Sequence, residues 1–225
     1  MEMVSMTFDE YIKGKRIAVV GPAGSMHGSE QGEELDKYDI IVRFNSAVPI
    51  KDEMKKDIGS RTDILCNCLE EHPVSGGHID PDLWVRENVQ WVLSPYPREL
   101  WYVRANVSRF EKLNKGRLKL ECTNKPFFDK LEKQLGTRPN SGLLGMLYIL
   151  NLDPAELYVT GITFGRGGYH PGYKDGISAA KYDKLANSHI HQQKPQEDLF
   201  REIYKKDSRI KADIILTQIL GERNV

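Results

Sequence analysis

A glycine-containing turn and a nearby pair of polar residues could together hold a phosphate. The turn Gly21–Ser25 reads Gly-Pro-Ala-Gly-Ser and follows an apolar run, while Arg43 and Asn45 stand at the end of the next apolar run. Backbone N–H groups in such a turn suit a phosphate, and a guanidinium with an amide suits a phosphate and a sugar or base edge. The glycines lack the G-x-G-x-x-G spacing of dinucleotide-binding folds, and no acidic residue ends the second run to bind a ribose. A tight strand-to-helix turn with a surface arginine is the structural alternative.

A second polar cluster, Asn140-Ser141-Gly142, opens a mostly apolar stretch. Asparagine is a favoured helix N-cap, and the unpaired N–H groups of a first helical turn can receive an anion. Gly142 and Gly145 would let a ligand or another backbone come close. An ordinary capped core helix is the structural alternative for this cluster.

Alternating strand and helix patterns predict the elements that position these residues. Apolar runs predict strands at 17–20, 40–44, 62–67, 89–94 and 157–160, and periodic stretches predict helices or helical turns at 25–37, 125–136, 141–152, 197–207 and 210–220. This alternation favours an α/β fold, a Rossmann-like α/β/α sandwich with a largely parallel sheet, and we expect residues 1–225 to form a single domain. Ligands of such sheets bind beyond the carboxyl ends of the strands, where Gly21–Ser25 lies. The glycine-, tyrosine- and histidine-rich stretch 165–191 predicts a long loop or short helix over that site.

Composition narrows the partners and the compartment. Lys+Arg and Asp+Glu number 32 each, so no global positive charge favours nucleic acid or an anionic membrane. The chain has no signal-peptide pattern, and no stretch approaches the roughly 20 apolar residues of a membrane span. Cys66, Cys68 and Cys122 are odd in number and lack the usual disulfide or zinc spacing. We therefore expect free thiols and a soluble, cytoplasmic protein without a nucleic-acid partner.

Four segments carry a family resemblance. Residues 19–45 resemble the large sialyl motif of the animal-type sialyltransferases, glycosyltransferase family 29, and residues 138–165 are similar to the small motif, which ends here as Gly161-Ile162-Thr163-Phe164-Gly165. His170-Pro171-Gly172-Tyr173 resembles the third motif, H-x-x-Y. His191 followed by Glu197 resembles the very small motif, H-x(4)-E. The four matches occur in the family's order.

The resemblance implies an inverting, metal-independent glycosyltransferase with a variant GT-A fold and no cofactor. It would move sialic acid or a related acidic sugar from a CMP-linked donor to a hydroxyl of a glycan or other acceptor. His191 would be the base, oriented by Glu197, with His189 as its competitor, and His170 would hydrogen-bond to or protonate the leaving phosphate. The resemblance places the donor at Gly21, Ala23, Gly24, Ser25, Arg43, Asn45, Asn67, Asn140, Ser141, Gly142, Thr163, Phe164, Gly165 and Tyr173.

The sequence departs from the family pattern in several places. Pro22 replaces the asparagine that usually follows the first glycine, the cysteines that link the large and small motifs are absent, and Glu197 follows His191 one residue later than usual. No stem or anchor precedes the motifs, so we expect a bacterial, viral or cytosolic relative. A nucleotide-binding α/β module without catalysis, and a glycosyltransferase that uses another nucleotide sugar, stay open.

One acidic pair offers a metal-dependent alternative. Asp80 and Asp82 form a D-x-D pair, which could hold a divalent ion on a diphosphate. Asp80 followed by Pro81 is also typical of a helix start, with the aspartate as N-cap and the proline at the first helical position. We expect the cap.

Overall fold

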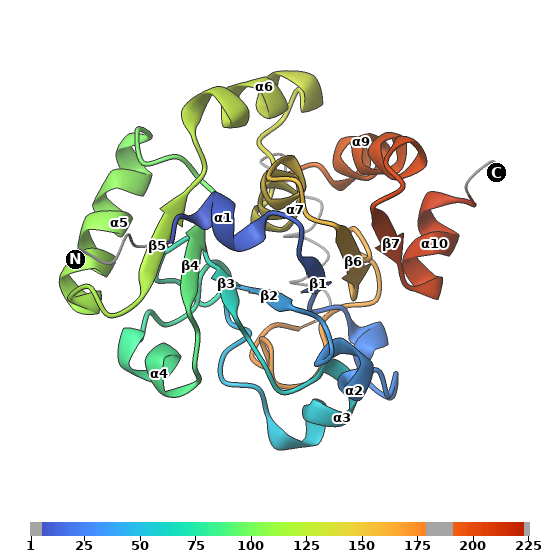
Figure 1. The fold of residues 1–225 in the computed structure, drawn as a ribbon, viewed down its shortest axis with the longest axis horizontal. Helices are drawn as coiled ribbons and strands as arrows, with labels where there is room; N and C mark the ends of the chain where they lie inside the picture. Colours follow the sequence, from blue (N-terminus) through green and yellow to red (C-terminus); the bar gives the residue numbers. More distant parts are fainter. Residues whose placement is uncertain (1–5, 179–190, 223–225) are drawn as a thin grey trace.

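Seven strands form one sheet in the computed structural model, which describes residues 6–178 and 191–222 (Figure 1). Every neighbouring pair is parallel, in the order β5-β4-β3-β2-β1-β6-β7. The predicted α/β fold with a parallel sheet is therefore confirmed. The strands are β1 Arg16–Val20, β2 Ile40–Phe44, β3 Ile64–Cys66, β4 Trp91–Ser94, β5 Lys119–Cys122, β6 Glu156–Thr160 and β7 Ile210–Ala212.

Helices cover both faces of this sheet. Figure 1 shows α6, α7 and α9 above the sheet and α2, α3 and α4 below it. The α-helices are α1 Phe8–Ile12, α2 Gly32–Leu35, α3 Lys55–Ile58, α4 Pro81–Arg86, α5 Trp101–Asn114, α6 Lys125–Leu135, α7 Ser141–Asn151, α9 Gln193–Lys206 and α10 Ile214–Leu220, and the short 3₁₀ helices are η1 Gly24–Met26 and η2 Asp52–Met54.

Two cores lie on the two faces because side chains alternate along a strand. Ile17 and Val19 of β1 belong to the larger core, which includes α7, whereas Ala18 and Val20 belong to a smaller core with residues from α2 and α3. Residues 143–150 of α7 are all buried. Only the two ends of this apolar helix, Ser141-Gly142 and Asn151, are open to solvent, and the Ser141-Gly142 end is the one that begins with free N–H groups.

Two predicted helices have a different structure. The segment 25–37 is broken into η1 and α2, because Gly28 and Glu30 have positive φ and both donate their N–H groups to the Asp57 carboxylate. The segment 210–220 begins as strand β7, which pairs with β6, and only then continues as α10. The strand β5 and the helix α5 were absent from the sequence-based prediction.

The strand order reverses between β1 and β6. The chain runs outward from β1 to β5 and returns to β6 on the other side of β1, so the strand order reverses there. Ligands of open α/β sheets bind at the carboxyl ends of the strands beside such a reversal. Gly21–Ser25 and the segment after β6 therefore meet at this position.

Candidate active site

The glycine turn after β1 binds protein backbone. Gly21 N–H donates to the Thr160 carbonyl at 2.8 Å, Ala23 N–H to Gly161 at 3.0 Å and Gly24 N–H to Gly168 at 2.9 Å. A Cβ atom on Gly21 would lie 2.3 Å from the Gly161 oxygen, so only glycine permits this approach. This corrects the prediction that these three N–H groups are offered to a phosphate.

Ser25 differs from the other residues of the turn. Its side chain is half-buried and forms no hydrogen bond within the described residues. It is therefore the residue of this turn with a polar group available to a ligand.

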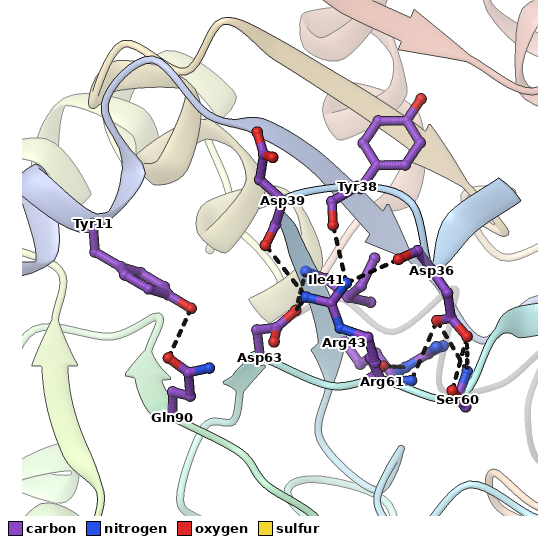
Figure 2. Close-up of polar contacts among 10 residues, drawn as sticks. All are labelled: Tyr11, Asp36, Tyr38, Asp39, Ile41, Arg43, Ser60, Arg61, Asp63 and Gln90. Carbon is purple, nitrogen blue, oxygen red and sulfur yellow. Dashed lines mark hydrogen bonds and ion pairs between the residues drawn. The ribbon is translucent and has the colours of Figure 1, made fainter. Parts of the chain in front are cut away.

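Arg43 points into the protein and does not reach a ligand. Its side chain is 1% exposed, with Nε donating to the Arg61 carbonyl at 2.9 Å and Nη2 donating to the Ile58 carbonyl. Figure 2 shows Arg43 beside Arg61 within a polar network. Burial lowers the pKa of Arg43 to about 10, which still leaves it charged at neutral pH. The predicted phosphate contact of Arg43 is wrong, because its guanidinium ties β2 to the connection before β3.

The Asn67 side chain is likewise hydrogen-bonded to other parts of the chain. It is fully buried, and its Nδ2 donates to the carbonyls of Asn45 at 3.2 Å and Gly76 at 2.9 Å. Its Oδ1 accepts the Leu69 N–H at 2.7 Å. Asn67 therefore shapes the loop after β3, and the predicted contact of its side chain with the nucleotide is not supported.

Asn45 and Tyr173 meet at the end of β2. Asn45 has a positive φ of 46° and is half-buried, and its Oδ1 accepts the Cys68 N–H at 3.2 Å. Burial raises the pKa of Tyr173 well above its ordinary value, against the lowering effect of the nearby Asn45 side chain. The structure thus brings together two predicted binding residues that are far apart in the sequence.

His170 adjoins this pair and is held as a neutral ring. Its backbone N–H donates to the Pro22 carbonyl at 3.0 Å, and its Nδ1 lies 2.7 Å from the Pro171 carbonyl. A carbonyl only accepts, so Nδ1 carries the proton and Nε2 carries the lone pair. Burial lowers the pKa of His170. A hydrogen bond from Nε2 to a leaving phosphate, as predicted, would require a second proton that burial opposes.

The cavity beside these residues is small. It is lined by Gly21, Arg43, Ile58, His170 and Tyr173 among others, and its volume is about 10 Å³. That is the room for one water molecule. This cavity is therefore too small to hold a nucleotide.

The first turn of α7 has free N–H donors. Asn140 is the predicted N-cap, and its Oδ1 accepts the Leu143 N–H at 2.8 Å, while its own N–H donates to Gln196 at 2.8 Å. The N–H groups of Ser141 and Gly142 have no partner in the part of the chain that the structure describes, and both residues are half-buried. Asn140 is therefore a structural cap, whereas the next two N–H groups are open to an anion.

Close packing brings this turn to the strand ends. The Cys66 thiol at the end of β3 lies 3.7 Å from the Ser141 carbonyl, and a Cβ on Gly145 would lie 2.6 Å from the same sulfur. Gly145 thus permits close packing, as predicted, while a Cβ on Gly142 would meet only the Asn140 side chain, at 3.3 Å. The three cysteines carry free thiols, also as predicted.

His191 lies beside the start of α7 in a form suited to a base. Its Nδ1 lies 3.0 Å from the Arg138 carbonyl, so Nδ1 carries the proton and Nε2 carries the free lone pair. Burial lowers the pKa of His191, and the Arg138 charge lowers it further, against the opposing effect of the backbone hydrogen bond. The ring is therefore neutral at pH 7. His189, the competing candidate, lies outside the described residues.

Glu197 does not orient His191. It is 4% exposed and forms ion pairs with Arg166 at 2.6 Å and with Arg201. Burial alone would raise the pKa of Glu197, but hydrogen bonds and charges from both arginines outweigh burial and lower it. The predicted role is wrong, because the Arg138 carbonyl holds the histidine while Glu197 joins α9 to the segment after β6.

The Thr163–Gly165 segment is also structural. The Thr163 hydroxyl donates to the Arg166 carbonyl at 2.6 Å, and the Phe164 ring packs 6.0 Å from Phe200 of α9. Gly165 has a positive φ of 86° in the turn that follows. Contacts of Thr163 and Phe164 with a nucleotide are not supported, since the Thr163 hydroxyl closes the turn and the Phe164 ring packs against α9.

The D-x-D pair is a helix cap, as predicted. The Asp80 Oδ1 accepts the Leu83 N–H at 3.0 Å, with Pro81 at the first position of α4, and Asp82 pairs with Arg117. Within residues 6–178 and 191–222, no group of three or more His, Cys, Asp and Glu residues is placed to hold a metal ion.

Sequence reasoning missed Arg138. Its guanidinium lies over the rings of Tyr96 at 4.3 Å and Tyr102 at 4.6 Å, and its carbonyl binds His191. An arginine two residues before a helix N-cap was the available signal. Its stacking partners, by contrast, lie in the connection after β4 and in the first turn of α5, and they could not be paired with it by spacing.

These observations first indicate the general class of protein. A doubly wound parallel sheet, a neutral histidine and an open helix N-terminus near the strand ends are suited to binding an anionic ligand and removing a proton from a second one. The model of glycosyltransferase family 29 (sialyltransferase) matches residues 8–140, more than half of the chain. The chain belongs to this family.

Curated relatives are similar over part of their length. A mouse CMP-N-acetylneuraminate-beta-galactosamide-alpha-2,3-sialyltransferase 2 is 27% identical over 188 residues, covering 76% of this chain and 49% of the relative. A rat beta-galactoside alpha-2,6-sialyltransferase 2 is 30% identical over 155 residues, covering 60% of this chain and 29% of the relative. The chain thus spans half the length or less of these relatives.

Solved structures share the fold. The sialyltransferase CstII from Campylobacter jejuni, in complex with CMP-3FNeuAc, has a TM-score of 0.60 at 13% identity, covering 94% of this chain and 87% of that one. A mammalian sialyltransferase in complex with Gal-beta-1-3GalNAc-ortho-nitrophenol has a TM-score of 0.58 at 16% identity, covering 92% and 71%. Among the described residues, no helix has the length and apolar character needed to cross a bilayer.

Proposed function

We propose that this chain transfers sialic acid or a related acidic sugar from a CMP-linked donor to an acceptor hydroxyl, with inversion and without a metal ion. Family membership supports the CMP-linked donor. The observation that carries catalysis is His191, whose proton sits on Nδ1 against the Arg138 carbonyl and whose Nε2 has no partner among the described residues, close to the first turn of α7.

In the proposed reaction the acceptor oxygen attacks the anomeric carbon of the donor sugar. The bond between that carbon and the phosphate oxygen breaks on the opposite face, and CMP leaves with the electron pair. Nε2 of His191 takes the proton of the acceptor hydroxyl and later releases it to solvent. The transition state resembles an oxocarbenium ion, as in glycoside hydrolysis.

Backbone donors supply the anion site in this proposal. The free N–H groups of Ser141 and Gly142 bind the donor's phosphate or carboxylate, where the helix dipole also favours negative charge. Asn45 and Tyr173 form the side of the site at the end of β2, with the Ser25 hydroxyl across the glycine turn. The His170 ring lies 6.0 Å from that of Tyr173.

The test is turnover of CMP-N-acetylneuraminic acid with lactose as acceptor, followed by the release of CMP. We expect product with or without EDTA, and calorimetric binding of CMP but not of NAD. Binding of CMP without turnover would favour a nucleotide-binding module, and activity lost to EDTA and restored by manganese would favour a metal-dependent enzyme. Asp80→Asn is the matched control, because asparagine can still accept the Leu83 N–H as the cap but lacks the carboxylate charge that a metal ion would need, so turnover should not change.

A further inference from the structure

Arg138 lies between two aromatic rings without an acidic partner. Its guanidinium is 4.3 Å from the centre of the Tyr96 ring and 4.6 Å from that of Tyr102. Its Nε is buried without a hydrogen-bond partner, and no Asp or Glu pairs with Arg138 in the part of the chain that the structure describes. A buried donor without a partner lowers stability, so the place of this charge indicates a use other than holding the fold together.

The two rings hold the guanidinium without neutralising it. Tyr96 is 4% exposed, and its hydroxyl donates to the Pro139 carbonyl at 3.2 Å, while Tyr102 belongs to the first turn of α5. Burial raises the pKa of Tyr96 and of Tyr102, so both rings are uncharged at neutral pH. The faces of such rings attract a cation but carry no net negative charge. Arg138 therefore keeps its positive charge in a fixed place.

The same residue acts on His191 in two ways. The Arg138 carbonyl lies 3.0 Å from Nδ1 of His191, which leaves the lone pair on Nε2. The Arg138 charge also lowers the pKa of His191, in addition to the effect of burial. One residue thus fixes where the first proton of the ring lies and opposes the second.

Acidic groups of the neighbouring elements do not offset this charge at His191, as far as the described residues go. Glu197 of α9 is ion-paired with two arginines of its own surroundings. Glu70, in the loop after β3, and Glu132 of α6 act on the Tyr102 hydroxyl instead. The repulsion between the guanidinium and a protonated His191 is therefore uncompensated.

We propose that Arg138 is a positioning residue of the reaction, which sets both the tautomer and the protonation of His191. Its carbonyl keeps the proton on Nδ1, and its guanidinium, held by Tyr96 and Tyr102, opposes a second proton on Nε2. The base therefore stays able to take the acceptor's proton below pH 7 as well as above it. This inference rests on the proposed function, since it names the residue that keeps the base of that reaction neutral.

The experiment titrates His191 by NMR in the unaltered chain and in three variants, Arg138→Met, Arg138→Gln and Arg138→Lys. The His191 signal is the one that is missing from His191→Gln. The two neutral substitutions should raise the pKa of His191 toward the ordinary 6.5, whereas lysine keeps the charge and should hold the pKa near that of the unaltered chain. Arg98→Met is the matched control, because Arg98 lies in the same connection as Tyr96 but is paired with Glu111 at 2.6 Å.

The kinetic readout is a ratio that a merely structural role would not change. In Arg138→Met, kcat/KM at pH 5.5 divided by kcat/KM at pH 8 should fall by about threefold or more, because more of His191 is protonated at the lower pH. A general loss of structure would lower both values together and leave the ratio as it is. Arg98→Met should also leave the ratio unchanged.

Nitrogen-15 NMR of the unaltered chain tests the tautomer and needs no variant. We expect the proton of the neutral ring on Nδ1. A proton on Nε2, an unchanged pKa of His191 in both neutral variants, or an equal shift in Arg98→Met would overturn the inference. Because the NMR measurements need no turnover, failure of CMP-N-acetylneuraminic acid to react beside the expected shift would count against the proposed function alone.

Discussion

The amino and carboxyl edges of the sheet both have polar residues, but they differ in whether these residues have hydrogen-bond partners. At the amino edge, the Arg61 guanidinium donates to the carbonyls of Asp36, Tyr38 and Asp39 and to the Asp63 carboxylate, as Figure 2 shows. At the carboxyl edge, the N–H groups of Ser141 and Gly142 and Nε2 of His191 remain free of partners within the described chain.

Whether a polar group has a hydrogen-bond partner therefore distinguishes structural from functional polar residues in this chain. A buried donor must be paired, so a saturated network stabilises the fold and offers nothing to a ligand. Half-buried donors without partners are available to bind. Arg43 shows the distinction best, because it lies near the carboxyl end of β2 and yet belongs to the saturated network through the Arg61 carbonyl.

The largest expected effect is at the open edge. His191→Ala should lower kcat by about 10²- to 10⁴-fold, because the acceptor proton loses its base. CMP affinity and the melting temperature should change little, since in the proposed reaction the histidine contacts the acceptor and not CMP. Initial rates at saturating donor, with calorimetry for CMP, provide the measurement. His189→Ala is the control, and an inactive His189 variant beside an active His191 variant would transfer the role to His189.

Arg43→Met should act through stability alone. Two buried carbonyls lose a charged donor, so we expect the free energy of unfolding to fall by about 2–4 kcal/mol. Urea unfolding measures this change, and kcat and CMP affinity at low temperature should be nearly those of the unaltered chain. Weakened CMP binding in a fully stable variant would identify Arg43 as a ligand contact. It would contradict the inference that paired polar groups of this chain serve stability alone.

Ser141→Pro removes one free N–H group and little else. Proline is tolerated at the first position of a helix, and Asn140 already has the extended φ of −77° and ψ of 163° that a following proline favours. Loss of one hydrogen bond to a charged ligand should weaken donor binding by about 1.5–3 kcal/mol. Ser141→Ala keeps the N–H group and should bind the donor normally; equal loss in both variants would point to the hydroxyl.

The smallest expected effect is a displacement of the pH profile. Only neutral His191 can take a proton, and burial lowers its pKa from the ordinary 6.5. The acid limb of kcat/KM should therefore fall below pH 6.5, and a limb above that value would contradict the assignment.

Glu197→Gln should leave the limb in place, because Glu197 does not contact His191. Glu197→Gln should instead lower the free energy of unfolding above pH 4.5, where the ionised carboxylate of the unaltered chain is stabilising. This difference should disappear as the pH falls through the lowered pKa of Glu197.

Local sequence predicted what depends on near neighbours. The strands β1, β2 and β6 follow from short β-branched runs, and the caps at Asp80 and Asn140 follow from contacts three residues along the chain. The order of the motifs also predicted the family. These features require no knowledge of distant segments, because propensity and capping act within one turn or strand.

Tertiary structure decided which polar groups are free. The Arg43 guanidinium is bound by residues 15 and 18 positions away, and the Arg138 carbonyl that fixes the proton of His191 is 53 positions away. The strand β7 likewise exists only because β6 pairs with it. A sequence shows that an arginine, an asparagine or a histidine is present, but its availability depends on whether packing brings a carbonyl or carboxylate within hydrogen-bond distance.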